Sequence, residues 1–276
     1  MKISGVSLGT KNGNNDTMCR VALEAAKEKG AEIEFIHLLD WDIQYCSGCV
    51  ACSRGLVMGK GMICSRQDDF KAFYEKVVEA DGVLFVDPIF ESGATGLYHS
   101  ITDRMGPGHD TGMMKMLDGK LKEAGKEGLN PRYFRQKALS FVGIGGSDWA
   151  VRCETDHAMF ALSPGWKVVN NEFFSWCKDV IMQDDKVERM KEIGRNLADA
   201  AQQIIDEDMQ IEGSEKTSLW KGKEGACPHC QGNNFYIYPG TTHCVCELCG
   251  LEGTLEIVDG AFKFKYDPAT EHHAHD

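Results

Sequence analysis

The sequence lacks an apolar run that could cross a membrane, and it has no excess of positive charge. Its longest apolar runs, such as residues 82–86, fall far short of the roughly 20 residues that span a bilayer, and residues 1–4 lack the apolar segment of a signal peptide. Lys and Arg number 30 against 42 Asp and Glu, which gives a formal net charge of −12 and no basic patch for a phosphate backbone. We therefore expect a cytoplasmic protein that binds neither membrane nor nucleic acid.

Cysteine, in contrast, is abundant and clustered. Of the 12 cysteines, one group lies within residues 46–64 and another within residues 227–249, while Cys19, Cys153 and Cys177 stand alone. In a chain that is not secreted, clustered cysteines are more often metal ligands or redox groups than disulfides. The two clusters predict two separate sites.

Short β-like runs alternate with helical patterns over residues 1–211. We expect strands at residues 2–8, 32–36, 82–87, 138–143 and 167–174, and helices at about 17–29, 68–79, 95–104, 148–162 and 184–208. This alternation predicts an α/β domain with a doubly wound parallel sheet, whose ligands sit beyond the carboxyl ends of the strands. The glycine-rich residues 106–136 interrupt the pattern; we interpret them as a surface elaboration or an oligomer contact, with a substrate lid as the alternative.

A second, smaller unit follows the first. Residues 212–225 are polar and charged and form the predicted linker, residues 226–268 form a cysteine-bounded module, and residues 269–276 form a tail. Near the end of the module, Asp259-Gly260 stands between alternating runs and predicts a β-hairpin.

The module contains two CxxC pairs with fifteen residues between them. This spacing is typical of a zinc ribbon, in which two knuckles supply four tetrahedral thiolates. The predicted ligands are Cys227, Cys230, Cys246 and Cys249. We expect structural zinc, with a single iron as the alternative metal and with Cys244 or His243 as alternative ligands in place of Cys246.

The first cluster reads CSGCVAC and is followed by one further cysteine. Thiolates three positions apart in a turn can point at one centre, and a fourth thiolate from a following loop can complete the set. We predict a [4Fe–4S] cluster on Cys46, Cys49, Cys52 and Cys64. Redox-active or structural cysteines are the main alternative, and zinc is a third.

Three loops that follow predicted strands carry a further signal. In SLGTKNGNNDT a strand runs into a helix amino terminus, where backbone N–H groups and the helix dipole favour a phosphate, although a plain polar helix cap is the alternative. The loops DPIFESGATG and GIGGSDW, which begin at residues 87 and 143, contain Gly and small polar residues that let backbone amides approach a flat ligand.

The order of these motifs resembles the NADPH-dependent FMN reductase family of flavodoxin-like proteins, and within it the iron-sulfur flavoproteins. The resemblance covers about residues 1–205 and implies a five-stranded sheet of order 2-1-3-4-5, bound FMN and a homodimer or homotetramer. It departs from the family where an arginine is missing from Ser7-Leu8-Gly9-Thr10 and where the last cysteine interval is longer. The FMN contacts that it implies are Ser7, Gly9, Thr10, Asn12, Asn14, Asn15 and Thr17 for the phosphate, Pro88, Ile89, Phe90, Glu91, Ser92 and Gly93 along the isoalloxazine, and Gly145, Gly146 and Ser147 as a third contact.

The expected activity is that of a flavin-dependent oxidoreductase, which passes electrons from NAD(P)H or reduced ferredoxin through FMN and the cluster to a small-molecule or protein acceptor. One alternative is a reductase of a quinone, a nitro or azo compound or an activated double bond, without a cluster. Another is a metal- or redox-sensing scaffold that binds a protein partner. His109 and His157 are the candidate proton donors, and an ordinary structural role is the alternative for each.

Overall fold

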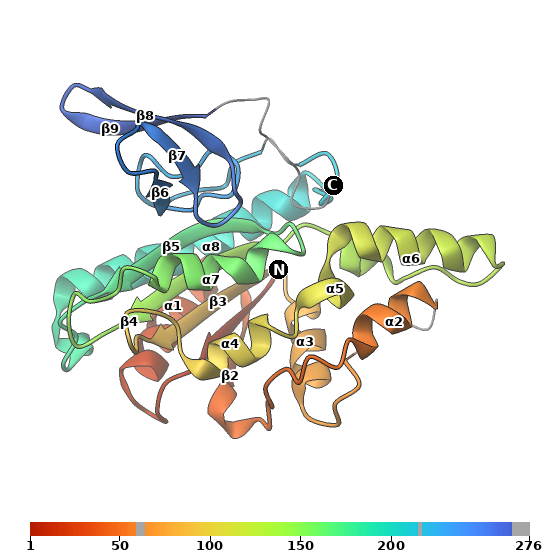
Figure 1. The fold of residues 1–276 in the computed structure, drawn as a ribbon. Coiled ribbons are helices and arrows are strands. Elements are labelled where there is room, and N and C mark those ends of the chain that lie inside the picture. Colours follow the sequence, from red (N-terminus) through yellow and green to blue (C-terminus); the bar gives the residue numbers. More distant parts are fainter. Residues whose placement is uncertain (59–63, 215–216, 267–276) are drawn as a thin grey trace.

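The computed structural model of the chain describes residues 1–58, 64–214 and 217–266. Most of them form a parallel sheet with helices on both faces, and a small antiparallel sheet follows (Figure 1). The parallel sheet has the order β2-β1-β3-β4-β5 and consists of β1 (Lys2–Ser7), β2 (Glu32–His37), β3 (Gly82–Pro88), β4 (Ala138–Ile144) and β5 (Lys167–Phe174). The predicted flavodoxin-like α/β fold and its strand order are confirmed.

Each face of the sheet carries its own apolar core. One core includes α1 (Asn14–Glu28) and α8 (Asp184–Asp206), and the other includes α3 (Phe70–Glu79), α4 (Gly96–Thr102) and α7 (Cys153–Leu162). In β3, Leu84 and Val86 belong to the first core, whereas Val83 and Phe85 belong to the second. Side chains alternate between the faces of a strand, so a strand covered on both faces is apolar throughout. We therefore expect polar side chains that bind a ligand at the ends of the strands and in the loops that follow them.

The insertion at residues 106–136 folds beside the helix that carries Cys52. It contains α5 (Gly106–His109), α6 (Thr111–Glu123) and the short helix η2 (Pro131–Phe134), and it packs against α2 (Ala51–Val57). Leu56 of α2 and Met114 and Leu117 of α6 form a small apolar cluster. Two further short helices are η1 (Leu38–Asp40) and η3 (Val180–Met182). In the described part of the chain, no helix is both long and apolar enough to cross a membrane.

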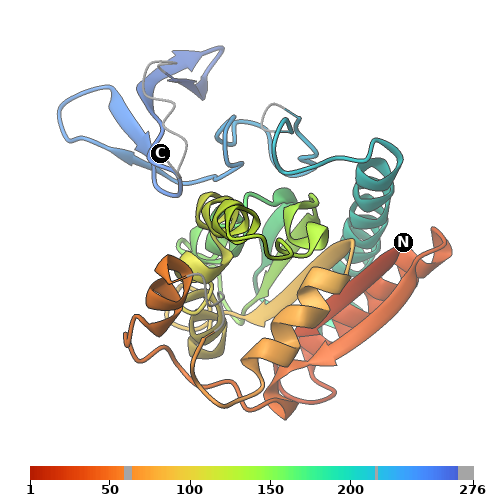
Figure 2. The ribbon, with the colours of Figure 1, turned by 90° about the vertical axis from the view of Figure 1, so that its right-hand side faces the viewer.

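The small sheet forms the predicted C-terminal module, and we call residues 226–266 the ribbon. Its antiparallel strands, in the order β6-β7-β8-β9, are β6 (Phe235–Ile237), β7 (His243–Cys246), β8 (Glu252–Val258) and β9 (Ala261–Tyr266). Asp259 and Gly260 both have positive φ, 54° and 79°, and they join paired Val258 and Ala261, so the predicted hairpin is confirmed. The ribbon lies beyond β5, on the side of the molecule opposite β2 (Figures 1 and 2).

Polar and apolar contacts attach the ribbon to α7 and to the residues just before it. Asn234 Nδ2 donates to the Val151 carbonyl at 2.7 Å and to Thr155 Oγ1 at 2.8 Å. One turn farther along α7, Ala158 is buried in a cluster with Leu248 of the ribbon. These contacts hold the ribbon against the larger domain.

Helices α1 and α8 pack so closely that one glycine has no room for a side chain. A Cβ on Gly194 would lie 2.1 Å from the carbonyl oxygen of Ala22, an atom of the helix backbone that cannot move aside alone. Gly119 in α6 has nothing within 4 Å of the same position. The two glycines therefore form a matched pair of helical sites.

We expect Gly194→Ala to lower the free energy of unfolding by about 1–3 kcal/mol, because the methyl group forces α1 and α8 apart. Gly119→Ala should raise it by about 0.4–1 kcal/mol, since alanine restricts the unfolded chain and costs nothing in the helix. Urea unfolding of both variants measures the difference. Equal stabilisation by the two substitutions would contradict the packing described here.

Candidate flavin and metal sites

Four loops meet at the carboxyl ends of the parallel strands, and we call this edge the rim. They are the phosphate loop (residues 7–17), the second loop (88–95), the third loop (145–152) and the fourth loop (175–179). Asn14 Nδ2 donates to the Cys177 carbonyl at 2.9 Å, and the Cys177 N–H donates to the Gly145 carbonyl at 3.0 Å. These bonds join the first, third and fourth loops into one structure. The helix expected at residues 148–162 begins only at Cys153, which makes the third loop longer than predicted.

The phosphate loop leaves donors at a helix amino terminus. The first N–H groups of a helix have no partner within the helix, and the cap of α1, Gly13, supplies no side-chain hydrogen bond. Beside them, Asn15 Nδ2 is buried without a hydrogen-bond partner. Gly9 packs against the Asn15 side chain, because a Cβ at residue 9 would lie 2.5 Å from Asn15 Oδ1. An unpaired buried donor beside an uncapped helix start fits a phosphate group.

Asp16, which the sequence analysis did not single out, occupies part of the same loop. Its carboxylate accepts from Ser7 Oγ at 2.5 Å and from the Asn12 N–H at 2.7 Å, and it lies 3.0 Å from His37 Nδ1. Burial would raise the pKa of Asp16, but these hydrogen bonds outweigh burial and hold the pKa below its ordinary value. The Ser7 hydroxyl and the Asn12 amide, both predicted to contact phosphate, thus already have a partner.

The second loop makes a tight turn at the rim. Glu91 and Ser92 have positive φ, 47° and 65°, and Phe90 and Gly93 exchange backbone hydrogen bonds of 3.2 and 3.0 Å. The turn exposes 65% of the Phe90 side chain and buries Ser92. Pro88 closes β3, and the Ile89 N–H donates to the Ile144 carbonyl at 3.0 Å, which ties this loop to β4.

The buried side chain of Asp87 holds the second loop in place. Asp87 accepts from the Thr95 N–H at 2.8 Å and from Thr95 Oγ1 at 2.7 Å, and its other neighbour is His157 Nε2 at 3.2 Å. His157 Nδ1 lies 3.5 Å from Cys153 Sγ, and none of these side chains is exposed to solvent by more than 6%. The chain Cys153-His157-Asp87-Thr95 connects the start of α7 to the loop.

Neither predicted proton donor lies where a substrate could reach it. Burial favours neutral His157, but Cys153 and Asp87 outweigh burial and raise its pKa to about 10, so His157 holds its proton against Asp87. His109 lies in the core with its ring 3.8 Å from that of Tyr74, and burial, with a smaller effect of Arg104, lowers its pKa to about 3. Both side chains are buried, which favours a structural role, and the catalytic role of His109 and His157 stays a prediction.

The third and fourth loops add exposed aromatic side chains to the rim. Gly145 is hemmed in by Ile89, whose Cδ1 would lie 3.2 Å from an added Cβ, while Gly146 faces open space. Ser147 Oγ accepts from the Trp149 N–H at 3.3 Å. Trp149 is 60% exposed, and Trp176, at φ 58° in the fourth loop, is 64% exposed. Trp176 follows a strand that was predicted, but nothing in its local sequence distinguishes it from a core residue.

The four thiols of the first cluster differ in their exposure. Cys46 and Cys49 are exposed, and Cys52 and Cys64 are half-buried. Among the residues that the structure describes, no three of these sulfur atoms gather within 4.8 Å of one another. The Ala51 N–H and the Ser65 hydroxyl lower the pKa of Cys49 to about 7, which makes it a reactive thiol. The predicted [4Fe–4S] site stays a prediction.

The four predicted ribbon cysteines, in contrast, converge. The Sγ atoms of Cys227, Cys230, Cys246 and Cys249 all lie within 4.8 Å of one another. Cys230 Sγ also accepts from the Gly232 N–H at 3.4 Å, a bond that stabilises a thiolate ligand. Cys244 is buried outside this group, and its thiol donates to the Gly253 carbonyl. Four soft thiolates at this spacing fit a tetrahedral metal ion.

Both a family profile and individual proteins resemble this chain. A profile of the family described as NADPH-dependent FMN reductase matches residues 1–179. An iron-sulfur flavoprotein of Archaeoglobus fulgidus is 28% identical over 150 residues, which cover 54% of this chain and 64% of that protein, slightly less than two thirds of its length. A flavone synthase of Aspergillus candidus is 27% identical over 286 residues, which cover 98% of this chain and 83% of that protein. The solved structure of a flavone reductase has 39% identity and a TM-score of 0.82, covering 100% of this chain and 84% of that chain.

Asn15→Asp should weaken FMN binding by roughly 10- to 100-fold, because a carboxylate would replace the one buried donor beside the helix start and repel the phosphate. The dissociation constant from quenching of FMN fluorescence measures this effect. Asn130→Asp, which changes the net charge equally at an exposed helix cap, is the matched control and should bind FMN as the wild type does. Equal affinities for all three proteins would place the phosphate elsewhere.

Cys246→Ser should abolish metal binding by the ribbon and unfold it, since metal ligation supplies much of the folding free energy of so small a module. Cys244→Ser should keep the metal, because Cys244 lies outside the ligand group. Metal content per chain and the rate of proteolysis within the ribbon report both effects. If Cys246→Ser kept the metal and Cys244→Ser lost it, Cys244 rather than Cys246 would be the ligand.

Proposed function

Because this chain belongs to the NADPH-dependent FMN reductase family, whose members are flavin-dependent oxidoreductases, we propose that it reduces the conjugated carbon–carbon double bond of a flat aromatic ketone of the flavone type. The electron donor in this proposal is NAD(P)H. One NAD(P)H and one proton are consumed for each double bond that is saturated, and one NAD(P)⁺ is released.

Exposed aromatic side chains at the rim are the observation that carries this proposal. Phe90, Trp149 and Trp176 come from three different loops at the carboxyl ends of neighbouring strands, and each exposes 60% or more of its side chain. Solvent-exposed aromatic rings at the rim can stack on a flat aromatic ligand. Stacking is favourable because it removes apolar surface of both partners from water.

Bound FMN supplies the two-electron chemistry that connects the nicotinamide to the substrate. The residues of this chain hold and orient the reactants around it. Asn15 and the start of α1 would bind the phosphate, and the Asp87–His157 pair fixes the second loop, which would border the ring system. Phe90, Trp149 and Trp176 would position the substrate and exclude water from the reacting bond.

The extent of the similarity favours a reductase of this type over a general electron carrier. The flavone synthase and the flavone reductase match the chain over 98% and 100% of its length, which includes the ribbon, whereas the iron-sulfur flavoprotein matches 54% of it. The flavone class of substrate comes to this chain by analogy with these two relatives.

An electron-transfer protein with a [4Fe–4S] cluster is the second candidate. It is favoured by the spacing of Cys46, Cys49, Cys52 and Cys64 and by the iron-sulfur flavoproteins among the relatives. Iron and sulfide analysis of protein purified without oxygen decides between the two candidates. About four irons per chain in addition to the ribbon metal would support the cluster. Reduction of a flavone by iron-free protein would support the reductase.

Trp176→Ala should raise KM for a flavone about tenfold and leave kcat nearly unchanged, because stacking with the indole contributes to binding before and during the reaction. Anaerobic oxidation of NADPH with apigenin as substrate measures both constants. Tyr236→Ala removes a comparably exposed aromatic residue from the ribbon and serves as control. Absence of flavone-dependent NADPH oxidation in FMN-loaded wild-type protein would refute the proposed function.

A further inference from the structure

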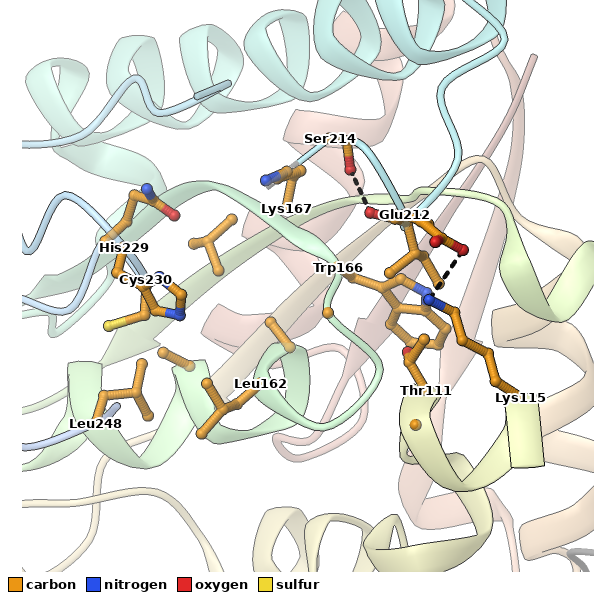
Figure 3. A pocket seen from close by; sticks show the side chains of 17 residues that line it. Thr111, Lys115, Leu162, Trp166, Lys167, Glu212, Ser214, His229, Cys230 and Leu248 are labelled. Carbon is orange, nitrogen blue, oxygen red and sulfur yellow. Dashed lines mark hydrogen bonds and ion pairs between the residues drawn. The ribbon is translucent and has the colours of Figure 1, made fainter. Parts of the chain in front are cut away.

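A cavity lies where the ribbon meets the amino-terminal end of β5. Its volume is about 370 Å³, which falls within the usual range for small-molecule sites. Figure 3 shows His229, Cys230 and Leu248 of the ribbon on one side of it and Lys115 and Glu212 on the other. Because β5 has 8 residues, the cavity lies about 25 Å from the rim at the opposite end of the strand, so it is separate from the flavin site.

Most of the cavity wall is apolar. Its apolar lining comes from α7, β5, the segment after α8 and the ribbon, namely Ala158, Ala161, Leu162, Val168, Ile211 and Leu248. Two sequence-distant parts of the larger domain, residues 158–168 and Ile211, and one part of the ribbon thus build a single space. A wall of this kind fits a compact hydrocarbon body, which gains free energy by leaving water.

Trp166 adds an unpaired donor to this apolar wall. The Trp166 side chain lines the cavity and is 5% exposed, and its Nε1–H has no hydrogen-bond partner in the part of the chain that the structure describes. A buried indole N–H normally finds an acceptor, because a buried donor without one loses its hydrogen bond to water with no compensation. The N–H itself is buried, so an acceptor on a ligand in the cavity reaches it only after neighbouring side chains shift.

The charged residues of the lining favour an anionic acceptor. Lys115 lines the cavity, and Glu212 is the only acidic residue in the described lining. Lys115 Nζ forms an ion pair with Glu212 at 3.1 Å, and the two side chains are 45% and 78% exposed (Figure 3). An ion pair this exposed contributes little free energy, so a ligand carboxylate can replace Glu212 beside Lys115.

We propose that this cavity is a second ligand site, which binds a small monocarboxylate with a compact apolar body. The body lies among Leu162, Ile211 and Leu248. The carboxylate accepts from Trp166 Nε1 and takes Lys115 as its counter-ion, while Glu212 turns to solvent. Since the ribbon supplies one wall, the site exists only when the ribbon is docked.

Calorimetric titration of the FMN-loaded full chain with 4-tert-butylbenzoate tests this proposal, because the probe is rigid, fits the size of the site and offers no activated double bond to the flavin centre. We expect one binding event per chain, and we expect the neutral amide of the same shape to bind at least tenfold more weakly. Lys115→Met should weaken binding of the carboxylate about tenfold, Trp166→Phe about fivefold, and Glu212→Gln should strengthen it about threefold.

Flavin absorbance and reductase turnover locate the bound probe. Turnover unaffected by a saturating probe supports a site away from the rim, whereas competition with the flavone substrate would assign the probe to the flavin site and overturn the proposal. Absence of any binding heat would also overturn it, as would binding that neither Lys115→Met nor Trp166→Phe weakens. Lys115 is on the surface, so Lys115→Met should fold, and it tests the proposal even if Trp166→Phe does not fold.

Discussion

The buried carboxylate of Asp87 is the constraint on which the rim depends. It stands at the end of β3, accepts two hydrogen bonds from Thr95 and faces the imidazole ring of His157 on α7. A buried charge without partners would cost several kcal/mol, so the three elements must stay together for any of them to be stable. The second loop, which would border a flavin, is thereby held in place by a fully buried side chain.

Helix α7 joins the two units of the protein through two different parts of its surface. His157 points inward to Asp87, and the neighbouring residue Ala158 packs against Leu248 and the buried ribbon cysteines. One helix therefore supports the rim on one side and the metal module on the other. The cavity at the end of α7 exists for the same reason, because the first knuckle of the ribbon closes a space that the larger domain leaves open.

Sequence patterns predicted the parts of this protein that depend on local periodicity or spacing. The doubly wound parallel sheet follows from alternating strands and helices, its strand order follows from the family resemblance, and the ribbon cysteines converge as their CxxC spacing indicates. The burial of His109 and His157 could not be predicted, because the sequence around a single histidine does not reveal whether the fold buries it. Asp16, Trp176 and the cavity were likewise missed, since each gains its significance from residues far away along the chain.

The segment between the two units also protects the sheet. The Lys221 N–H donates to the Val169 carbonyl at 2.7 Å, Asn170 Nδ2 lies 3.2 Å from the Lys221 carbonyl, and Leu219 is buried in the core. The chain thus runs along the outer side of β5, where an exposed strand would offer unpaired backbone groups to another polypeptide. By occupying this edge with its own connecting residues, the protein removes a template for uncontrolled β-aggregation next to the strand that carries both of its proposed ligand sites.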